Sequence, residues 1–87
     1  MSYRVELTRS AKRALTEELP EAVAVACWEF ITGPLAENPH RVGKPLRDRL
    51  AGRHSARRGE FRLIYEIVDD RVLVRVVLIQ HRRDAYR

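Results

Sequence analysis

The sequence is poor in the residues that build disulfide frameworks, metal cages and membrane spans. Cys27 is the single cysteine among 87 residues, which excludes an intramolecular disulfide and a cage of cysteine thiolates. His40, His54 and His81 are too far apart in sequence for a paired metal-binding motif, and there is no Gly-rich phosphate loop. No stretch approaches the roughly 20 apolar residues that cross a bilayer, and the N-terminus has no apolar run of signal-peptide length. We therefore expect a cytoplasmic protein without a cofactor, with Cys27 in its core.

Negative charge is also scarce. The chain has 17 Lys and Arg residues against 12 Asp and Glu, which gives a formal net charge of +5 and a pI near 10.1. This balance favours polyanionic partners such as RNA, DNA or an acidic protein. The length of 87 residues predicts one domain, residues 1–87, with two layers around a single core.

The apolar residues predict the order strand, helix, helix and then three strands. Residues 3–7 alternate as a short strand. Thr8 or Ser10 can then cap a helix, and apolar positions at helical spacing predict that helix over residues 11–19. Pro20 should end this helix and begin a second one, which should end near residue 32, at a Gly-Pro stop signal. Residues 72–80 are apolar on both faces, like a central strand, and should pair with the first strand. We expect an α+β fold: a small, twisted, mainly antiparallel four-stranded sheet, with the N-terminal helical hairpin on one face and a basic concavity on the other.

Two apolar residues of the second helix, Val25 and Trp28, lie outside the stripe that should cover the sheet. Either the first helix and a loop cover them, or they form a docking surface, because a large exposed apolar patch on a small protein usually has a partner.

Strand patterning and positive charge coincide between residues 53 and 67, where the spacing predicts a β-hairpin. Arg53, Ser55 and Arg57 fall on one face of a period-two strand, and an Arg-Gly pair marks the turn. The next strand places Arg62 on the solvent face, opposite its apolar residues. Several cations across neighbouring strands make a face that suits a phosphate. The same alternation points His54 away from Arg53 and Arg57.

These arginines and histidines, together with Ser55 and Tyr86, could bind a phosphodiester, stabilise the charge that develops on it and move protons. That is the equipment of a metal-free ribonuclease. The same residues suit a non-catalytic nucleic-acid-binding module. Composition alone favours the module, because basic surfaces are common and active sites are rare.

The order of elements, the Gly-Lys-Pro-Leu-Arg segment at 43–47, residues 54–65 and the closing segment 81–86 together resemble the RelE branch of the RelE/ParE toxin superfamily. The resemblance covers essentially the whole chain, and residues 54–65 are its most specific part. It implies a toxin of a type II toxin–antitoxin system that cleaves mRNA in the ribosomal A site as an endoribonuclease, without a metal. It also implies an acidic RelB-like antitoxin as partner, the toxin being a monomer alone or a hetero-oligomer with that antitoxin.

The resemblance also assigns roles to individual residues. Arg62 matches the arginine that holds the scissile phosphate, and Arg82 matches the arginine that protonates the leaving oxygen. Tyr86 matches a tyrosine that stacks on or orients the nucleotide. The implied reaction is attack of a 2′-hydroxyl on the adjacent phosphate, which gives a 2′,3′-cyclic phosphate and a 5′-hydroxyl.

The general base is open. Arg53 and Arg57 match basic strand positions, but the best-known members carry a lysine between them where this chain has Ser55. His54 beside it and His81 at the end of the last strand are equal candidates. Alternatives are a ParE-like toxin that poisons gyrase, and an Arg57-Arg58 pair that binds ribosomal RNA or an acidic antitoxin segment. The predicted RNA-binding residues are Arg53, Ser55, Arg57, Arg58, Lys44 and Arg47.

Overall fold

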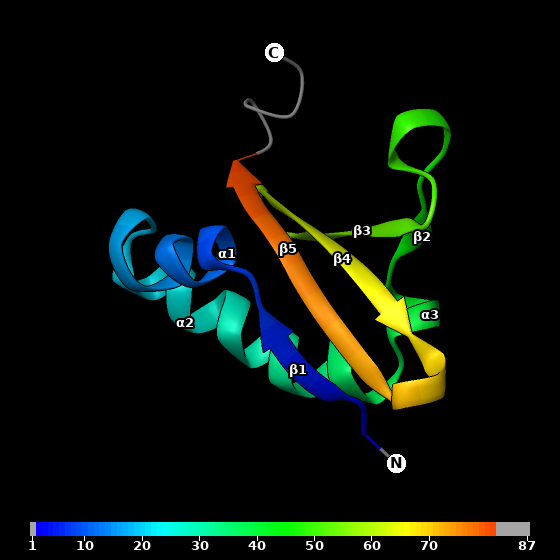
Figure 1. Ribbon diagram of the computed structural model, residues 1–87. Helices are drawn as coiled ribbons and strands as arrows, with labels where there is room; N and C mark the ends of the chain where they lie inside the picture. Colours follow the sequence, from blue (N-terminus) through cyan, green and yellow to red (C-terminus); the bar gives the residue numbers. More distant parts are fainter. Residues whose placement is uncertain (1, 82–87) are drawn as a thin grey trace.

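The computed structural model describes residues 2–81. They form a five-stranded sheet in the order β1-β5-β4-β3-β2, with helices packed on one of its faces (Figure 1). The strands are β1 (Arg4–Leu7), β2 (Lys44–Pro45), β3 (Arg53–Arg58), β4 (Phe61–Val68) and β5 (Leu73–His81). β1 runs parallel to β5, and all other neighbours are antiparallel. The predicted α+β class, the mainly antiparallel sheet and the pairing of the first and last strands are confirmed.

The predicted strand number of four was too low by one. The additional strand, β2, has only two residues, and it pairs with His54 and Ser55 at the edge of the sheet. Two residues, the second of them a proline and the first preceded by a glycine, are too few for a period-two pattern, so the sequence carries no signal for this strand.

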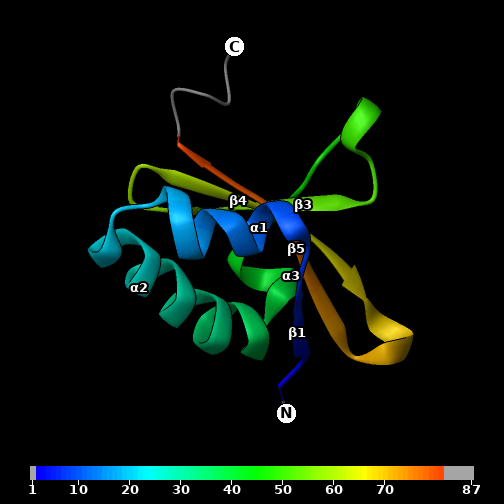
Figure 2. The ribbon, with the colours of Figure 1, turned by 60° about the vertical axis from the view of Figure 1, so that its left-hand side comes forward.

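Two helical segments begin where the sequence predicts. α1 (Arg9–Arg13) is capped by Thr8, whose Oγ1 accepts a hydrogen bond from the amide of Ala11, and it continues into a π-helical turn, Ala14–Glu18. α2 (Glu21–Phe30) starts directly after Pro20. Both helices lie on the same side of the sheet (Figure 2).

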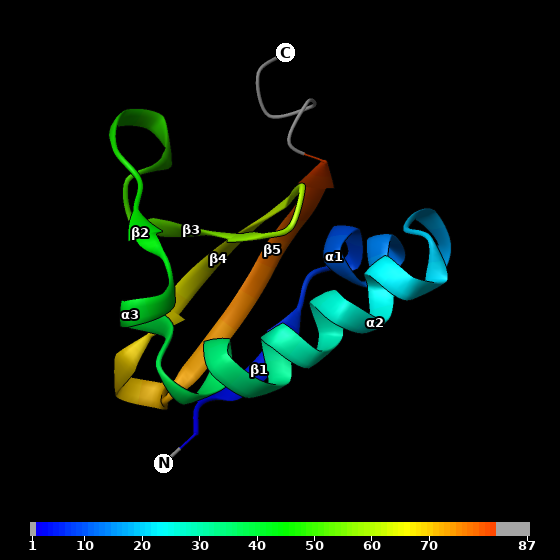
Figure 3. The same cartoon turned by 180° about the vertical axis from the view of Figure 1, so that it is seen from behind.

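The predicted stop of the second helix was wrong. The chain stays helical beyond α2 as a π-helical turn, Ile31–Leu35, that contains Gly33 and Pro34. Ile31 and Leu35 are fully buried, so burial of these two side chains opposes the local breaking signal. A short helix, α3 (Pro39–Val42), then lies near β2 and the β4–β5 turn (Figure 3).

The core fills the space between the sheet and the helices, and Tyr65 is its largest fully buried side chain. Cys27 lies in this core as predicted. Val25 and Trp28 are 51% and 46% exposed, so the first helix does not cover them. None of the described helices is long and apolar enough to cross a membrane.

Candidate nucleic-acid interface

The face of the sheet opposite the helices, here called the open face, carries five of the nine predicted site residues that lie within residues 2–81. Alternate residues of β3 and β4, including Ala56, Leu63 and Tyr65, point into the core. The residues between them therefore point to the open face. Cross-strand register arranges these residues in three rows. The cationic row is Arg57, Arg62 and Gln80; the middle row is Lys44, Ser55, Ile64 and Leu78; the ion-pair row is Arg53, Glu66, Arg75 and Glu6.

The cationic row places two arginines on neighbouring strands. Arg57 and Arg62 are directly opposite each other on β3 and β4. Like charges in that position repel, and an anion between them removes the repulsion. Guanidinium groups match the oxygens of a phosphate with two parallel hydrogen bonds. The pairing of Arg57 with Arg62 is therefore suited to a phosphodiester.

A groove of about 650 Å³ adjoins this row. It exists because β2 begins only at Lys44, opposite Ser55, which leaves the second half of β3 without a strand on its outer side. The backbone of residues 42–46 forms one wall. Polar side chains reach the groove from three strands: Lys44, Ser55, Arg57 and Arg62.

Gly43 and Tyr65 hold β2 and Lys44 in place beside this groove. Tyr65 is fully buried and its hydroxyl donates a 2.6 Å hydrogen bond to the carbonyl oxygen of Pro39; burial raises its pKa to about 12. A Cβ at residue 43 would collide with the Tyr65 hydroxyl and lie 2.7 Å from the carbonyl oxygen of Ser55. Glycine is therefore needed for the close approach of this segment to β3 and β4.

The ion-pair row occupies the other end of the open face. Arg75 Nε lies 2.7 Å from Glu6 Oε1, and Arg75 Nη1 lies 3.3 Å from Glu66 Oε1. Arg53 Nε lies 3.7 Å from the second oxygen of Glu66. The Arg75 guanidinium lowers the pKa of Glu6, and the two carboxylates raise the pKa of Arg75. Arg53, predicted to bind RNA, thus has a protein carboxylate as its neighbour.

His54 lies on the helix side of the sheet, as strand alternation predicts. Its ring stacks on Tyr65 with 5.6 Å between ring centroids and meets His40 edge-on at 5.9 Å. Its Nδ1 is buried and has no hydrogen-bond partner among the described residues, and burial lowers the pKa of the ring. His54 does not contact the groove that contains Arg62.

His81 ends β5, one residue beyond Gln80 of the cationic row. Its ring meets Phe61 edge-on at 5.1 Å, and its Nε2 lies 3.4 Å from a carboxylate oxygen of Glu60. The two predicted tail residues, Arg82 and Tyr86, lie outside the described residues.

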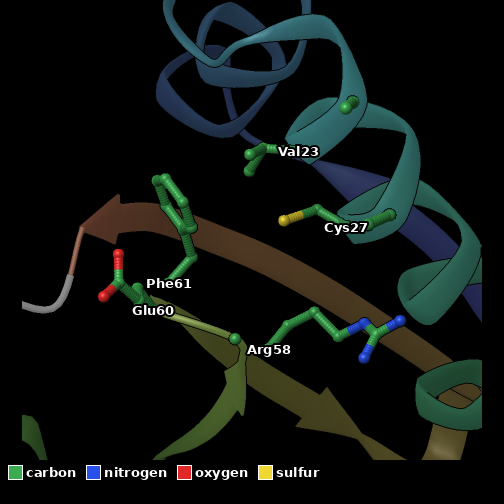
Figure 4. Close-up of a pocket in the computed structure, with 8 residues that line it drawn as sticks. Val23, Cys27, Arg58, Glu60 and Phe61 are labelled. Carbon is green, nitrogen blue, oxygen red and sulfur yellow. The ribbon is translucent and has the colours of Figure 1, made fainter.

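Arg57 and Arg58 diverge. Arg58 points to the helix side, where it borders a pocket of about 410 Å³ between α2 and the β3–β4 turn (Figure 4). Val23, Cys27 and Phe61 form apolar walls of that pocket, and burial raises the pKa of the Cys27 thiol. Arg58 is therefore separated from the open face. Arg47 is exposed and does not line the groove either.

The arrangement adds two features that sequence reasoning missed. One is the ion-pair row, since nothing in the sequence says which carboxylate faces which arginine. The other is the close approach at Gly43, whose only sequence signal is a glycine next to a basic, proline-containing segment. Within residues 2–81, no three His, Cys, Asp or Glu side chains gather as a metal-binding group.

Comparison with known proteins decides the family. Residues 5–86 match the family model described as the ParE toxin of type II toxin–antitoxin system, parDE. The chain belongs to the RelE/ParE toxin superfamily. Within it, the chain is 51% identical over 85 residues to Toxin RelE of Mycobacterium tuberculosis, covering 98% of this chain and 87% of the relative. It is 47% identical over 87 residues to Toxin RelG of the same organism, covering 100% and 99%.

Solved structures agree with this RelE/ParE assignment. The toxin–antitoxin complex RelBE2 from Mycobacterium tuberculosis contains a chain that is 45% identical, with a TM-score of 0.89 and coverage of 94% of this chain and 93% of the other. A chain of the intact RelBE complex from E. coli has a TM-score of 0.77 at 18% identity, with coverage of 92% and 96%, which shows the shared fold alone. The resemblance to the RelE branch is thereby confirmed.

Proposed function

We propose that this RelE/ParE toxin is an mRNA endoribonuclease that acts on ribosome-bound mRNA in the cytoplasm. The observation that carries the proposal is that Arg57 and Arg62 are directly opposite each other on β3 and β4 and line a groove together with Lys44 and Ser55. A single RNA strand fits such a groove through its phosphates. The similarity to Toxin RelE and Toxin RelG supports the same activity class.

In the proposed reaction the 2′-hydroxyl of one nucleotide attacks the adjacent phosphate, which gives a 2′,3′-cyclic phosphate and a 5′-hydroxyl. Negative charge grows on the phosphate oxygens in the transition state. Arg62 and Arg57 offset that charge from fixed positions on two paired strands, so no metal is required. Arg82 is the proposed proton donor to the leaving oxygen, and Tyr86 the proposed stacking residue.

For the general base, the geometry favours His81 over His54. By strand register both histidines point to the helix side, His54 opposite Tyr65 and His81 opposite Phe61. His54 is stacked on the buried Tyr65 ring, whereas His81 is partly exposed at the end of β5, one residue beyond Gln80 of the cationic row. His81→Gln should flatten the pH–rate profile near ~6–7, and His54→Gln should leave it unchanged. If neither variant changes the profile, proton abstraction belongs to another group.

The partner is proposed to be an acidic, RelB-like antitoxin. Structures similar to this chain are toxin–antitoxin complexes, and the net charge of +5 favours an acidic partner. Co-expression of the toxin with an acidic protein encoded beside it should give a soluble complex. A wild-type chain that expresses alone without arresting growth would contradict the toxin assignment.

Arg62→Ala tests the catalytic proposal. The single-turnover cleavage rate should fall about 100-fold or more, the scale for losing one preorganised electrostatic contact, while ribosome affinity changes little. Arg62→Lys should recover only part of the rate, because an ammonium group lacks the planar pair of donors. Arg71→Ala, at the exposed β4–β5 turn, is the matched control and should cleave normally. If Arg62→Ala cleaves at the wild-type rate, the site is elsewhere.

A second candidate is a gyrase-poisoning toxin, which the ParE description of the matching family model favours. Induction of an endoribonuclease should stop translation first and leave mRNAs cut at codon-phased positions. Induction of a gyrase poison should first produce DNA breaks. Early DNA breaks with intact transcripts would decide for the second candidate. RNA affinity that depends on salt, without any cutting, would instead indicate a non-catalytic binding module.

A further inference from the structure

The open face is divided electrostatically. At one end the cationic row presents two arginines beside the groove, and at the other the ion-pair row contains two carboxylates. Glu66 is central to the ion-pair row, since its two oxygens lie near Arg75 on β5 and Arg53 on β3. The arginines at this end are therefore occupied by protein carboxylates.

The proposed function leaves the path of the RNA strand open. From a phosphate at Arg62, a strand could run along β4 towards Glu66, or across the sheet over Arg57 to Lys44 at the edge. The first path crosses Ile64 and Leu78, which offer no hydrogen-bond donor, and then meets the carboxylates. The second path meets a guanidinium, a hydroxyl and an ammonium group, all of them lining the groove.

We propose that Glu66 sets the path of the RNA across the open face and is a specificity-determining residue of the toxin. This inference rests on the proposed function. Glu66 keeps Arg53 and Arg75 from binding phosphate and repels a strand that runs along β4. The RNA is thereby directed across the strands, from Arg62 over Arg57 to Lys44.

Distances along β4 support a boundary of this kind. Residues on one face of a strand are about 7 Å apart, so the middle row is about 7 Å and the cationic row about 13 Å from the Glu66 position. The Debye length at physiological ionic strength is about 8 Å. Glu66 therefore acts on a phosphate that lies over Ile64 on β4 and is largely screened from the phosphate at Arg62. It can select the path without weakening the reacting site.

The test measures RNA binding separately from cleavage. The probe is a labelled single-stranded 2′-O-methyl RNA oligonucleotide, which cannot be cut through a 2′-hydroxyl, at low salt. Removing one charge about 7 Å from a phosphate in water should strengthen binding about threefold in Glu66→Gln, and reversing it should strengthen binding about sevenfold in Glu66→Lys. Each additional phosphate bound should steepen the logarithmic salt dependence by about 0.7.

Three controls make the test specific. Glu66→Asp keeps the charge and should bind RNA like the wild type. Glu29→Gln and Glu29→Lys change the net charge in the same way, but at an exposed position of α2 on the helix side, and should change affinity less than twofold. Thermal unfolding of each variant checks that it is folded, and if Glu66→Lys does not fold, the Gln and Asp variants carry the comparison.

Two results would overturn the inference. Glu66 variants that bind RNA no more tightly than their Glu29 counterparts would show that only net charge matters. Glu66→Asp binding as tightly as Glu66→Gln would show that charge at this position is irrelevant. If either is found while Arg62→Ala still abolishes cleavage, the path inference fails and the proposed function stands. If wild-type protein binds no RNA at low salt, both fail.

Discussion

The close approach of Gly43 to Tyr65 makes the placement of the groove testable. A methyl group at residue 43 would overlap the Tyr65 hydroxyl and lie 2.7 Å from the Ser55 carbonyl oxygen. Neither can move freely, because Tyr65 is fully buried and bonded to Pro39, and Ser55 is paired with β2. Gly43→Ala should therefore destabilise the protein by about 2–3 kcal/mol, the upper range for overpacking. That is a large part of the stability of a small domain, about 5–15 kcal/mol.

A second substitution identifies the cause. Tyr65→Phe removes the hydroxyl and should by itself cost about 1–2 kcal/mol, because a buried hydrogen bond to the Pro39 carbonyl is lost. In the double variant the closest clash is absent, so its cost should be smaller than the sum of the single costs by about 1 kcal/mol or more. Free energies of unfolding from urea titrations measure all three variants. Gly33→Ala is the matched control, since a Cβ there would meet nothing within 4 Å, and it should be neutral or slightly stabilising.

The functional consequence should follow the structural one. Gly43 precedes Lys44, and displacement of β2 moves Lys44 away from the groove. Gly43→Ala should bind RNA more weakly, whereas Gly33→Ala should bind it normally. If the single costs of Gly43→Ala and Tyr65→Phe simply add within about 0.5 kcal/mol, the two groups do not clash and the reasoning is refuted.

Three further predictions concern backbone strain, pH dependence and binding. Val72 has a left-handed backbone with φ 51°, a conformation that asparagine adopts more readily than a β-branched residue. Val72→Asn should therefore raise the free energy of unfolding by about 1 kcal/mol and the Tm by about 4–8 °C. An unchanged or lower Tm would contradict this prediction. Burial lowers the pKa of His54, so the folded state binds a proton at this residue less readily than the unfolded state does. The stability that neutral His54 contributes is therefore present above the unfolded-state pKa of ~6.5 and is lost as the pH falls below that value. In urea titrations, His54→Gln should flatten this decline of the free energy of unfolding at acid pH, and an unchanged pH dependence would exclude His54 as its cause. Arg57→Ala should weaken RNA binding and reduce the salt slope by about 0.7, whereas Arg58→Ala should change neither; equal effects would place both arginines at the RNA.

Local sequence signals predicted much of the fold. Thr8 caps the first helix, Pro20 begins the second, and the period-two pattern of residues 53–67 produces the β3–β4 hairpin. The same period placed Arg62 on the open face and turned His54 away from it, because alternation along a strand is a property of neighbouring residues alone. The family resemblance was also contained in the sequence, in residues 54–65 above all.

Other features depend on residues that are distant in sequence. The helix continues past Gly33 and Pro34 because Ile31 and Leu35 are buried against the sheet, and burial opposes the local breaking signal. The two-residue β2 forms only because Gly43 fits against Tyr65.

The candidate site shows the same division between local and long-range causes. The sequence by itself determined the type of surface, a strand face rich in arginine in a toxin of the RelE/ParE superfamily. It could not determine which residue each arginine faces across the sheet. Arg53 faces Glu66 and Arg62 faces Arg57 because of the cross-strand register, and register is set by the packing of the whole sheet on its helices. Only the tertiary structure therefore decided that one end of the open face is cationic and the other is closed by ion pairs.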